Sequence, residues 1–210
     1  MHILSYPQKP LVYTEHEDAM GMNDLPCGVN AVVAIAAYGG WNMEDSIIVN
    51  QSALDRGLYM SIFYKSITIE ERKSGQYSHE SVCIPPLNIR TKSYNYDKLD
   101  VDGLVRLGTY VSDRDVIVGK VLTKTDKNKN ESFVDVSVTP KMGEAGYVDQ
   151  VILTTSQDGY KLVKVKIRKL RRLEVGDKLA ARSAQKSTVG ITYRQEDIDR
   201  KSTRLNSSHL

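Results

Sequence analysis

The stretch Gly146–Lys169, GYVDQVILTTSQDGYKLVKVKIRK, predicts a β-hairpin almost residue by residue. Apolar and polar residues alternate along both halves, which is the pattern of strands with one buried face. Asp-Gly between two alternating runs is a good hairpin signal. We therefore expect two strands around a turn at Ser156–Gly159, with Val163, Val165 and Ile167 on one shared face.

The other face of the return strand is basic. Lys164, Lys166 and Arg168 share it, within a longer basic run that covers Lys161–Arg172. Such a stripe could follow a nucleic-acid backbone, or it could be the solvated face of a hairpin. The run contains almost no aromatic residue, and aromatic stacking platforms usually accompany single-strand binding, which favours the solvated face.

Shorter patterns outside the hairpin indicate a mainly β fold with short helices, an α+β protein. The run at 30–40, NAVVAIAAYGG, is apolar throughout and predicts a strand buried on both faces. SIIVN at 46–50 predicts a second short strand. A short helix is expected after it, with Asn50 or Ser52 as N-cap and Gly57 at its end.

Bulk composition excludes several classes of protein. The chain has 210 residues, which allows one domain or two small ones, and its net charge of +3 is too small to indicate a polyanion partner by itself. Cys27 and Cys83 form no CxxC motif, which argues against a zinc site and a disulfide framework. No apolar run approaches the roughly 20 residues that cross a bilayer, and no secretory signal is visible. We expect an intracellular protein with no membrane partner.

An adjacent acidic pair, Glu44 and Asp45, follows Gly39-Gly40 in GGWNMEDSIIVNQS at 39–52. Mg²⁺ takes oxygen ligands, often one or two carboxylates together with substrate phosphates. Neighbouring residues of a regular strand point to opposite faces, so both carboxylates would converge only on a turn, which the glycines permit. The alternative is a solvated entry to the strand, and the residues alone leave both interpretations open.

A basic segment lies at 175–191, VGDKLAARSAQKSTVGI. Lys178, Arg182 and Lys186 recur every four residues and would lie on one face of a helix. Small residues around them would let a polyanion approach, but a basic solvated helix face is the plain alternative. Lysine binds phosphate as a point charge, so the functional interpretation requires a phosphate nearby.

Five ordered blocks of this chain resemble the second-largest subunit of multisubunit DNA-directed RNA polymerase, of the eukaryotic, archaeal and large-DNA-virus type. The resemblance covers about residues 3–198, and the blocks are YPQKPL, GVNAVVAIAAYGGWNMEDSIIVNQSALDRGLY, YDKLDVDGLV, VDQVILTTSQDGYKLVKVKIR and VGDKLAARSAQKSTVGITYRQED. It implies a central fragment of that subunit.

The resemblance also implies a division of the chain. Residues 1–60 would be the first part of a hybrid-binding domain that holds a partial double-psi β-barrel. Residues 61–172 would be the inserted, β-rich wall or flap, and residues 173–198 the return to the hybrid-binding domain. The polar, unpatterned residues 199–210 contain KSTRLNSSHL and are expected to be a non-native tail.

By resemblance the activity is nucleotidyl transfer, with RNA made from nucleoside triphosphates on a DNA template. Glu44 and Asp45 would help to place the second Mg²⁺, which arrives with the triphosphate, while aspartates of the largest subunit hold the first ion. Lys178 and Lys186 match two lysines near the RNA 3′ end and the incoming nucleotide. Further contacts to nucleic acid are expected from a set of polar and basic residues: Gln8, Arg182, Gln185, Lys164, Lys166 and Arg168.

The implied partners are the largest and the other polymerase subunits, template DNA, nascent RNA, nucleoside triphosphates and initiation factors. The isolated fragment is expected to be inactive. The alternative is a non-catalytic module, the wall, that binds nucleic acid or transcription factors in the same assembly. The expected location is the nucleus, or the cytoplasm or virion for a viral protein.

This sequence departs from the family pattern in the basic segment. The family often has Arg-His-Gly-Gln-Lys-Gly where this chain has Arg-Ser-Ala-Gln-Lys-Ser at 182–187. Lys186 is intact, but Ala184 and Ser187 replace both glycines. A position that needs positive φ would be strained by either replacement.

Overall fold

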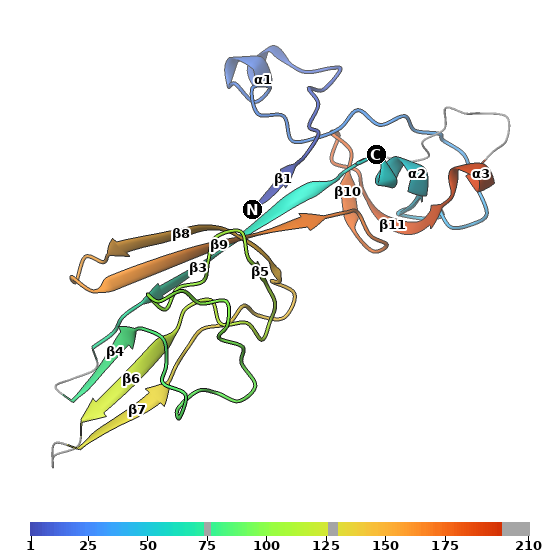
Figure 1. Cartoon of the computed structure of the whole chain (residues 1–210). Coiled ribbons are helices and arrows are strands. Elements are labelled where there is room, and N and C mark those ends of the chain that lie inside the picture. Colours follow the sequence, from blue (N-terminus) through green and yellow to red (C-terminus); the bar gives the residue numbers. More distant parts are fainter. Residues whose placement is uncertain (74–76, 126–129, 199–210) are drawn as a thin grey trace. The chain divides into compact units, whose positions relative to one another are not determined.

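The structure is a computed structural model that describes residues 1–73, 77–125 and 130–198. It is mainly β with short helices, as the sequence predicts (Figure 1). The strands are β1 His2–Leu4, β2 Ser46–Asn50, β3 Ser61–Glu70, β4 Ser78–Val82, β5 Tyr110–Val111, β6 Lys120–Thr125, β7 Glu131–Asp135, β8 Gly146–Thr155, β9 Lys161–Arg171, β10 Lys178–Ala180 and β11 Lys186–Tyr193. The helices are α1 Glu15–Ala19, α2 Gln51–Asp55 and α3 Gln195–Ile198.

The chain divides into two compact units. The central unit consists of Met1 and Phe63–Lys169, and the flanking unit consists of His2–Ile62 and the residues from Leu170 onward. The residues expected to be a non-native tail, 199–210, lie outside the described part of the chain. Among the described residues, no helix is both long enough and apolar enough to span a membrane.

The strands of the described residues form three sheets. One has the order β1-β3-β9-β8-β5, a second has the order β4-β6-β7, and a third has the order β10-β11-β2. The predicted hairpin is confirmed: β8 and β9 pair antiparallel from Tyr147–Arg168 to Thr155–Lys161. Its turn is closed by the amide of Gly159 on the carbonyl of Ser156 at 3.0 Å, and Gly159 has the positive φ of 82° that favours glycine.

The hairpin buries the face that the sequence assigns to it. Val163, Val165 and Ile167 are at most 1% exposed, because the alternation of β9 places all three on the core side of the sheet. The pairing register shifts between Val148 and Gln150, so β8 carries a bulge at this point. The bulge is confined to the stretch around the single inserted residue Asp149.

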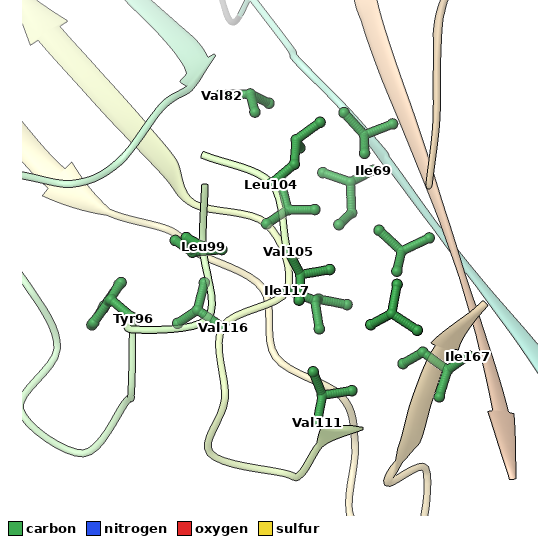
Figure 2. Packing of buried hydrophobic residues seen from close by; sticks show 14 residues of the cluster. Ile69, Val82, Tyr96, Leu99, Leu104, Val105, Val111, Val116, Ile117 and Ile167 are labelled. Carbon is green, nitrogen blue, oxygen red and sulfur yellow. The ribbon is translucent and has the colours of Figure 1, made fainter. Parts of the chain in front are cut away.

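The core of the central unit is one cluster of β-branched and leucine side chains together with Tyr96 (Figure 2). Its fully buried members come from the hairpin and from the segment 96–118 before β6, which is irregular apart from β5. They include Val111, Val116, Ile117 and Val118, each 0% exposed. Tight packing explains a small residue at Gly146, where a Cβ would lie 2.4 Å from the carbonyl oxygen of Arg168.

The flanking unit has a smaller core beneath the sheet β10-β11-β2. Ile47 and Val49 of β2 pack with Leu54 of α2, Leu173 and Val189 of β11. Helix α2 begins as predicted, because the side chain of Asn50 accepts a hydrogen bond from the amide of Ser52 at 2.9 Å. Gly57 follows the helix with a φ of 99°, which also agrees with the prediction.

Two predicted elements are wrong. The apolar run at 30–40 forms no strand, and Ile35 within it is 94% exposed. No strand pairs with this run in the described chain, and an apolar run becomes a buried strand only where such a partner exists. The helix expected to carry Lys178, Arg182 and Lys186 is instead the hairpin of β10 and β11.

We predict that Val165→Ala destabilises the central unit and that Val101→Ala does not. The two changes remove the same atoms, but Val165 is 0% exposed and Val101 is 91% exposed. Loss of two buried methyl groups, with the cavity that remains, costs about 2 kcal/mol. Urea unfolding of both variants provides the measurement. Equal midpoints for the two variants would contradict the core described above.

Candidate active centre

The sheet β10-β11-β2 brings the acidic and the basic candidate residues to one end. β2 runs parallel to β11, with Ser46 beside Thr188, and β10 runs antiparallel to it, with Lys178 opposite Thr188. The amide of Thr188 donates to the carbonyl oxygen of Asp45 at 2.7 Å. The acidic pair therefore precedes β2 at the same sheet end where β11 begins with Lys186.

The lysines share one face of this sheet. Residues directly opposite in an antiparallel pair lie on the same face, so the pairs Lys178–Thr188 and Ala180–Lys186 place both lysines together. The neighbouring pair, Leu179 and Ser187, points to the other face, where Leu179 packs on the small core. Both lysines are exposed, and neither has an ion pair within residues 1–73, 77–125 and 130–198.

The acidic pair lies on a turn, the geometry without which the two carboxylates could not share a side. Glu44 has a φ of 57°, in the left-handed region, and the preceding Gly39 and Gly40 have φ of 62° and 78°. Two side chains fix the turn from its ends. Asn42 accepts from the amide of Tyr38 at 3.0 Å and donates to the carbonyl of Ala36 at 2.5 Å.

Ser46 fixes the other end of the turn. Its hydroxyl lies 2.8 Å from the carbonyl oxygens of Trp41 and Met43. Across the turn, β11 comes close enough that a Cβ on Gly190 would lie 2.8 Å from the carbonyl oxygen of Trp41. A glycine at 190, next to the register shift in β11, therefore permits the turn to lie against the strand.

The two carboxylates are suited to a hard cation. Glu44 and Asp45 are exposed, and their side chains make no ion pair or hydrogen bond within the described parts of the chain. Unpaired carboxylate oxygens on a fixed turn are the ligand type that Mg²⁺ prefers. Among the described residues, no group of three or more His, Cys, Asp or Glu side chains is placed to hold a metal ion.

The turn between the two lysines is tight. The amide of Ala181 donates to the carbonyl of Gln185 at 2.8 Å, and that of Ala184 to the carbonyl of Ala181 at 3.0 Å. The family often has glycine at positions 184 and 187. Of the residues that replace them here, Ala184 has a φ of 66° and is therefore the strained one. The guanidinium of Arg182 donates to the carboxylate of Glu17, which partly neutralises its charge.

An ion pair fixes the start of β10. Asp177 accepts from the guanidinium of Arg171 at 2.5 Å and from the amide of Glu174 at 3.0 Å. The hydrogen bond from Arg171 holds the pKa of the Asp177 carboxyl below its usual range. Because Lys178 is the next residue, this contact fixes the backbone that carries the lysine.

The remaining predicted contact residues lie in different surroundings. The side-chain oxygen of Gln8 accepts a hydrogen bond from the backbone amide of Asn30 at 2.9 Å, so this oxygen is already engaged inside the protein. Gln185 is exposed in the β10–β11 turn. Lys164, Lys166 and Arg168 lie on β9 in the central unit, away in sequence from the acidic pair.

Sequence reasoning missed three residues that fix the backbone around the candidate charges. Asn42 and Ser46 flank the acidic pair, and Asp177 precedes Lys178. Asn and Ser side chains in turn segments often bond nearby backbone groups, and this signal could have identified the first two. An open, shallow hollow beside the turn is lined by Ile35, Ala36, Ala37, Asn42, Met43 and Glu44.

The family model described as RNA polymerase Rpb2, domain 6, matches residues 1–200. The chain therefore belongs to the Rpb2 domain 6 family, and it corresponds to part of the second-largest subunit of DNA-directed RNA polymerase.

Relatives from three kinds of source agree with this assignment. DNA-directed RNA polymerase II subunit RPB2 of Encephalitozoon cuniculi is 47% identical over 205 residues, which is 94% of this chain and 18% of the relative. A probable RPB2 homolog of Invertebrate iridescent virus 3 is 45% identical over 94% of the chain and 17% of the relative. DNA-directed RNA polymerase subunit Rpo2 of Sulfolobus acidocaldarius is 39% identical over 94% of the chain and 18% of the relative. The chain thus spans less than a fifth of these relatives.

We predict that Ala184→Gly stabilises the flanking unit. A left-handed conformation costs a non-glycine residue about 1–2 kcal/mol, and the extra flexibility of glycine takes back part of the gain. The expected net gain is about 0.5–1 kcal/mol by urea unfolding. Ala180→Gly in β10 is the matched control and should lower stability, because Ala180 lies in a strand. A loss of stability in both variants would count against a strained turn.

We also predict that the stability given by Asp177 depends on pH. Its folded pKa is lowered by Arg171, so the contribution is complete above the unfolded pKa of about 3.9 and is lost as pH falls through the folded value. Urea unfolding at a series of pH values from 6 to below about 3 should show the difference between the wild type and Asp177→Asn shrinking. Asp158→Asn, on the exposed hairpin turn, is the control. If the stability difference between the wild type and Asp177→Asn stays constant as the pH falls, the Arg171–Asp177 ion pair does not contribute to stability.

Proposed function

We propose that this chain contributes contacts for the second Mg²⁺ and for the nucleotide to the active centre of a DNA-directed RNA polymerase. The observation that carries the proposal is the meeting of two unpaired carboxylates and two unpaired lysines at one end of a sheet. Membership of the Rpb2 domain 6 family supports it, because its relatives are named as polymerase subunits. The reaction is nucleotidyl transfer from nucleoside triphosphates on a DNA template.

The acidic turn would hold oxygen ligands ready for the cation. Glu44 and Asp45 would hold a Mg²⁺ that arrives with the triphosphate, directly or through water. When bound, this ion neutralises the triphosphate and the leaving pyrophosphate. The hydrogen bonds of Asn42 and Ser46 fix the backbone of the turn before any ligand arrives, which lowers the cost of ordering it during the reaction.

The lysines would act on the phosphates as fixed positive charges. Lys178 and Lys186 share a sheet face, so one negative group could lie near both ammonium groups. Their charge would offset the repulsion between the RNA 3′ end and the incoming triphosphate and would position the two reacting ends. The Arg171–Asp177 pair serves as a support for Lys178.

Other molecules would complete the site. Two carboxylates satisfy only part of an octahedral cation, and the proposal places the first Mg²⁺ on aspartates of the largest subunit. The 210-residue chain alone is therefore expected to be inactive. Its partners would be other polymerase subunits, template DNA, nascent RNA and initiation factors. The chain would form part of a hybrid-binding domain with a partial double-psi β-barrel. It would act in the nucleus, or in the cytoplasm or virion for a viral protein.

The test replaces Glu44 by Gln and Asp45 by Asn in the complete polymerase. Both changes keep the shape of the side chains and remove the charge from the turn. One preorganised electrostatic contact is worth about a hundredfold in rate, and contact through water reduces this, so we expect single-nucleotide addition to slow roughly tenfold or more. The Mg²⁺ concentration at half-maximal rate should rise, while DNA binding changes much less.

The measurement is single-nucleotide addition on a preassembled RNA–DNA scaffold across a Mg²⁺ titration. The control variant carries Glu131→Gln and Asp158→Asn, which remove two exposed carboxylates of the central unit. Lys186→Ala should slow addition with less change in the Mg²⁺ requirement. If the acidic double variant matches the control at every Mg²⁺ concentration, the pair is only a solvated turn.

A further inference from the structure

The loop 36–45, which carries the acidic turn, is joined to a distant part of the chain by one aromatic side chain. The hydroxyl of Tyr38 donates to the backbone carbonyl of Asp197 at 2.6 Å, and the two residues are 159 positions apart in sequence. The ring of Tyr38 also meets the ring of Tyr193 edge to face, with centroids 6.0 Å apart at 83°. Tyr38 thus contacts both the last residue of β11 and helix α3.

The elements that receive this side chain are held within the flanking unit. Tyr193 pairs with Asn50 at the end of β2, and Asn50 is 2% exposed. In α3, Ile198 is 6% exposed, and the side-chain oxygen of Gln195 accepts from the guanidinium of Arg56 at 3.3 Å. The end of β11 and α3 therefore give the loop a fixed place of attachment.

The loop itself has little packing. Trp41 and Met43 are 53% and 65% exposed, and a segment with few buried apolar contacts opens easily. The side chains of Asn42 and Ser46 bond an amide and carbonyls that belong to the loop. These bonds give the loop its shape, but they do not fix where it lies against β11.

The loop is attached to the rest of the flanking unit at two points. At its C-terminal end, the amide of Thr188 donates to the carbonyl of Asp45 at 2.7 Å. Toward its N-terminal end, Tyr38 makes the contacts with α3 and the end of β11. Glu44 lies between the two attachments, so the loss of either one would let its carboxylate vary in position.

We propose that Tyr38 is a positioning residue for the acidic turn, and that its hydroxyl and ring hold Glu44 and Asp45 where a triphosphate-bound Mg²⁺ meets them. The inference rests on the proposed function of the active centre and adds a residue that acts without touching the ion. Ligands held in place before a cation arrives bind it more tightly than mobile ligands, because less conformational entropy is lost on binding. Removal of the Tyr38 hydroxyl should therefore weaken the use of Mg²⁺ while both carboxylates remain.

The first test measures the attachment without any metal. Trp41 is the only tryptophan of the chain and follows Tyr38 by three residues, so its fluorescence reports on the loop alone. In the 210-residue chain, Tyr38→Phe should lower the residual anisotropy of this fluorescence on the nanosecond timescale, because the loop moves more freely. Tyr13→Phe is the matched control, since Tyr13 is 50% exposed in the same unit, and it should match the wild type.

The second test measures the consequence in the complete polymerase. Tyr38→Phe should raise the Mg²⁺ concentration at half-maximal single-nucleotide addition about fivefold, the factor that corresponds to one ordinary hydrogen bond. The rate at saturating Mg²⁺ should change much less. Tyr193→Leu, which removes the ring contact, should shift the Mg²⁺ requirement in the same direction. Tyr193→Phe, which keeps the ring, and the control Tyr13→Phe should behave like the wild type.

A double-mutant cycle shows whether Tyr38 acts through the acidic pair. In a polymerase that carries Glu44→Gln and Asp45→Asn, the further change Tyr38→Phe should leave the Mg²⁺ requirement as it is. A full fivefold shift in that background would overturn the proposal, because Tyr38 would then act through other groups.

Two further outcomes would overturn the proposal. One is an unchanged anisotropy of Trp41 in Tyr38→Phe. The other is an unchanged Mg²⁺ requirement for Tyr38→Phe in a polymerase that the acidic double variant does slow. A normal rate and Mg²⁺ requirement for the acidic double variant itself is instead the failure of the active-centre proposal, so the two failures are distinguishable.

Discussion

The parallel pairing of β2 with β11 is the contact on which the candidate active centre depends. It joins residues about 140 positions apart in the chain, and the amide of Thr188 bonds the carbonyl of Asp45 at 2.7 Å. Without it, the acidic turn and the two lysines would belong to unrelated loops. The pairing is possible because residue 190 is glycine: any side chain there would collide with the carbonyl of Trp41. A close backbone approach thus decides which charges can act together.

The parts of the fold that follow from local sequence were predictable, and those that depend on distant pairing were not. The β8–β9 hairpin was predicted because its alternation and its Asp-Gly turn lie within 24 consecutive residues. The basic segment was assigned to a helix because Lys178, Arg182 and Lys186 have helical spacing. Lys178 and Lys186 instead lie on β10 and β11, which pair with each other, and β11 also pairs with β2, far away in sequence. Arg182 lies in the turn between the two strands, where Ala184 is left-handed, which the identity of alanine does not reveal.

The candidate sites also combine features that local sequence predicts with features that only the fold brings together. The two carboxylates at Glu44 and Asp45 indicated a cation. The turn that carries them is held by hydrogen bonds from Asn42 and Ser46 to nearby carbonyls, which no pattern of charges predicts. On the central unit, the basic strand lacked aromatic residues when considered alone. Tyr110 and Tyr147 share a sheet face with Arg168 only through two successive strand pairings, so this combination of side chains is not visible in any one segment.

The placement of paired and unpaired charges separates structural groups from functional ones. Lys120 is 8% exposed and bonds Glu80 at 2.5 Å and the carbonyl of Glu70 at 2.8 Å, so its charge is used inside the protein. Buried cations require such partners because desolvation without them is costly. Lys178 and Lys186 are exposed and unpaired in the described chain, and a phosphate could bind them without first breaking an internal ion pair. Arg168, shared with Asp149 at 3.7 Å, lies between these cases, and a ligand there would have to compete with one weak internal contact.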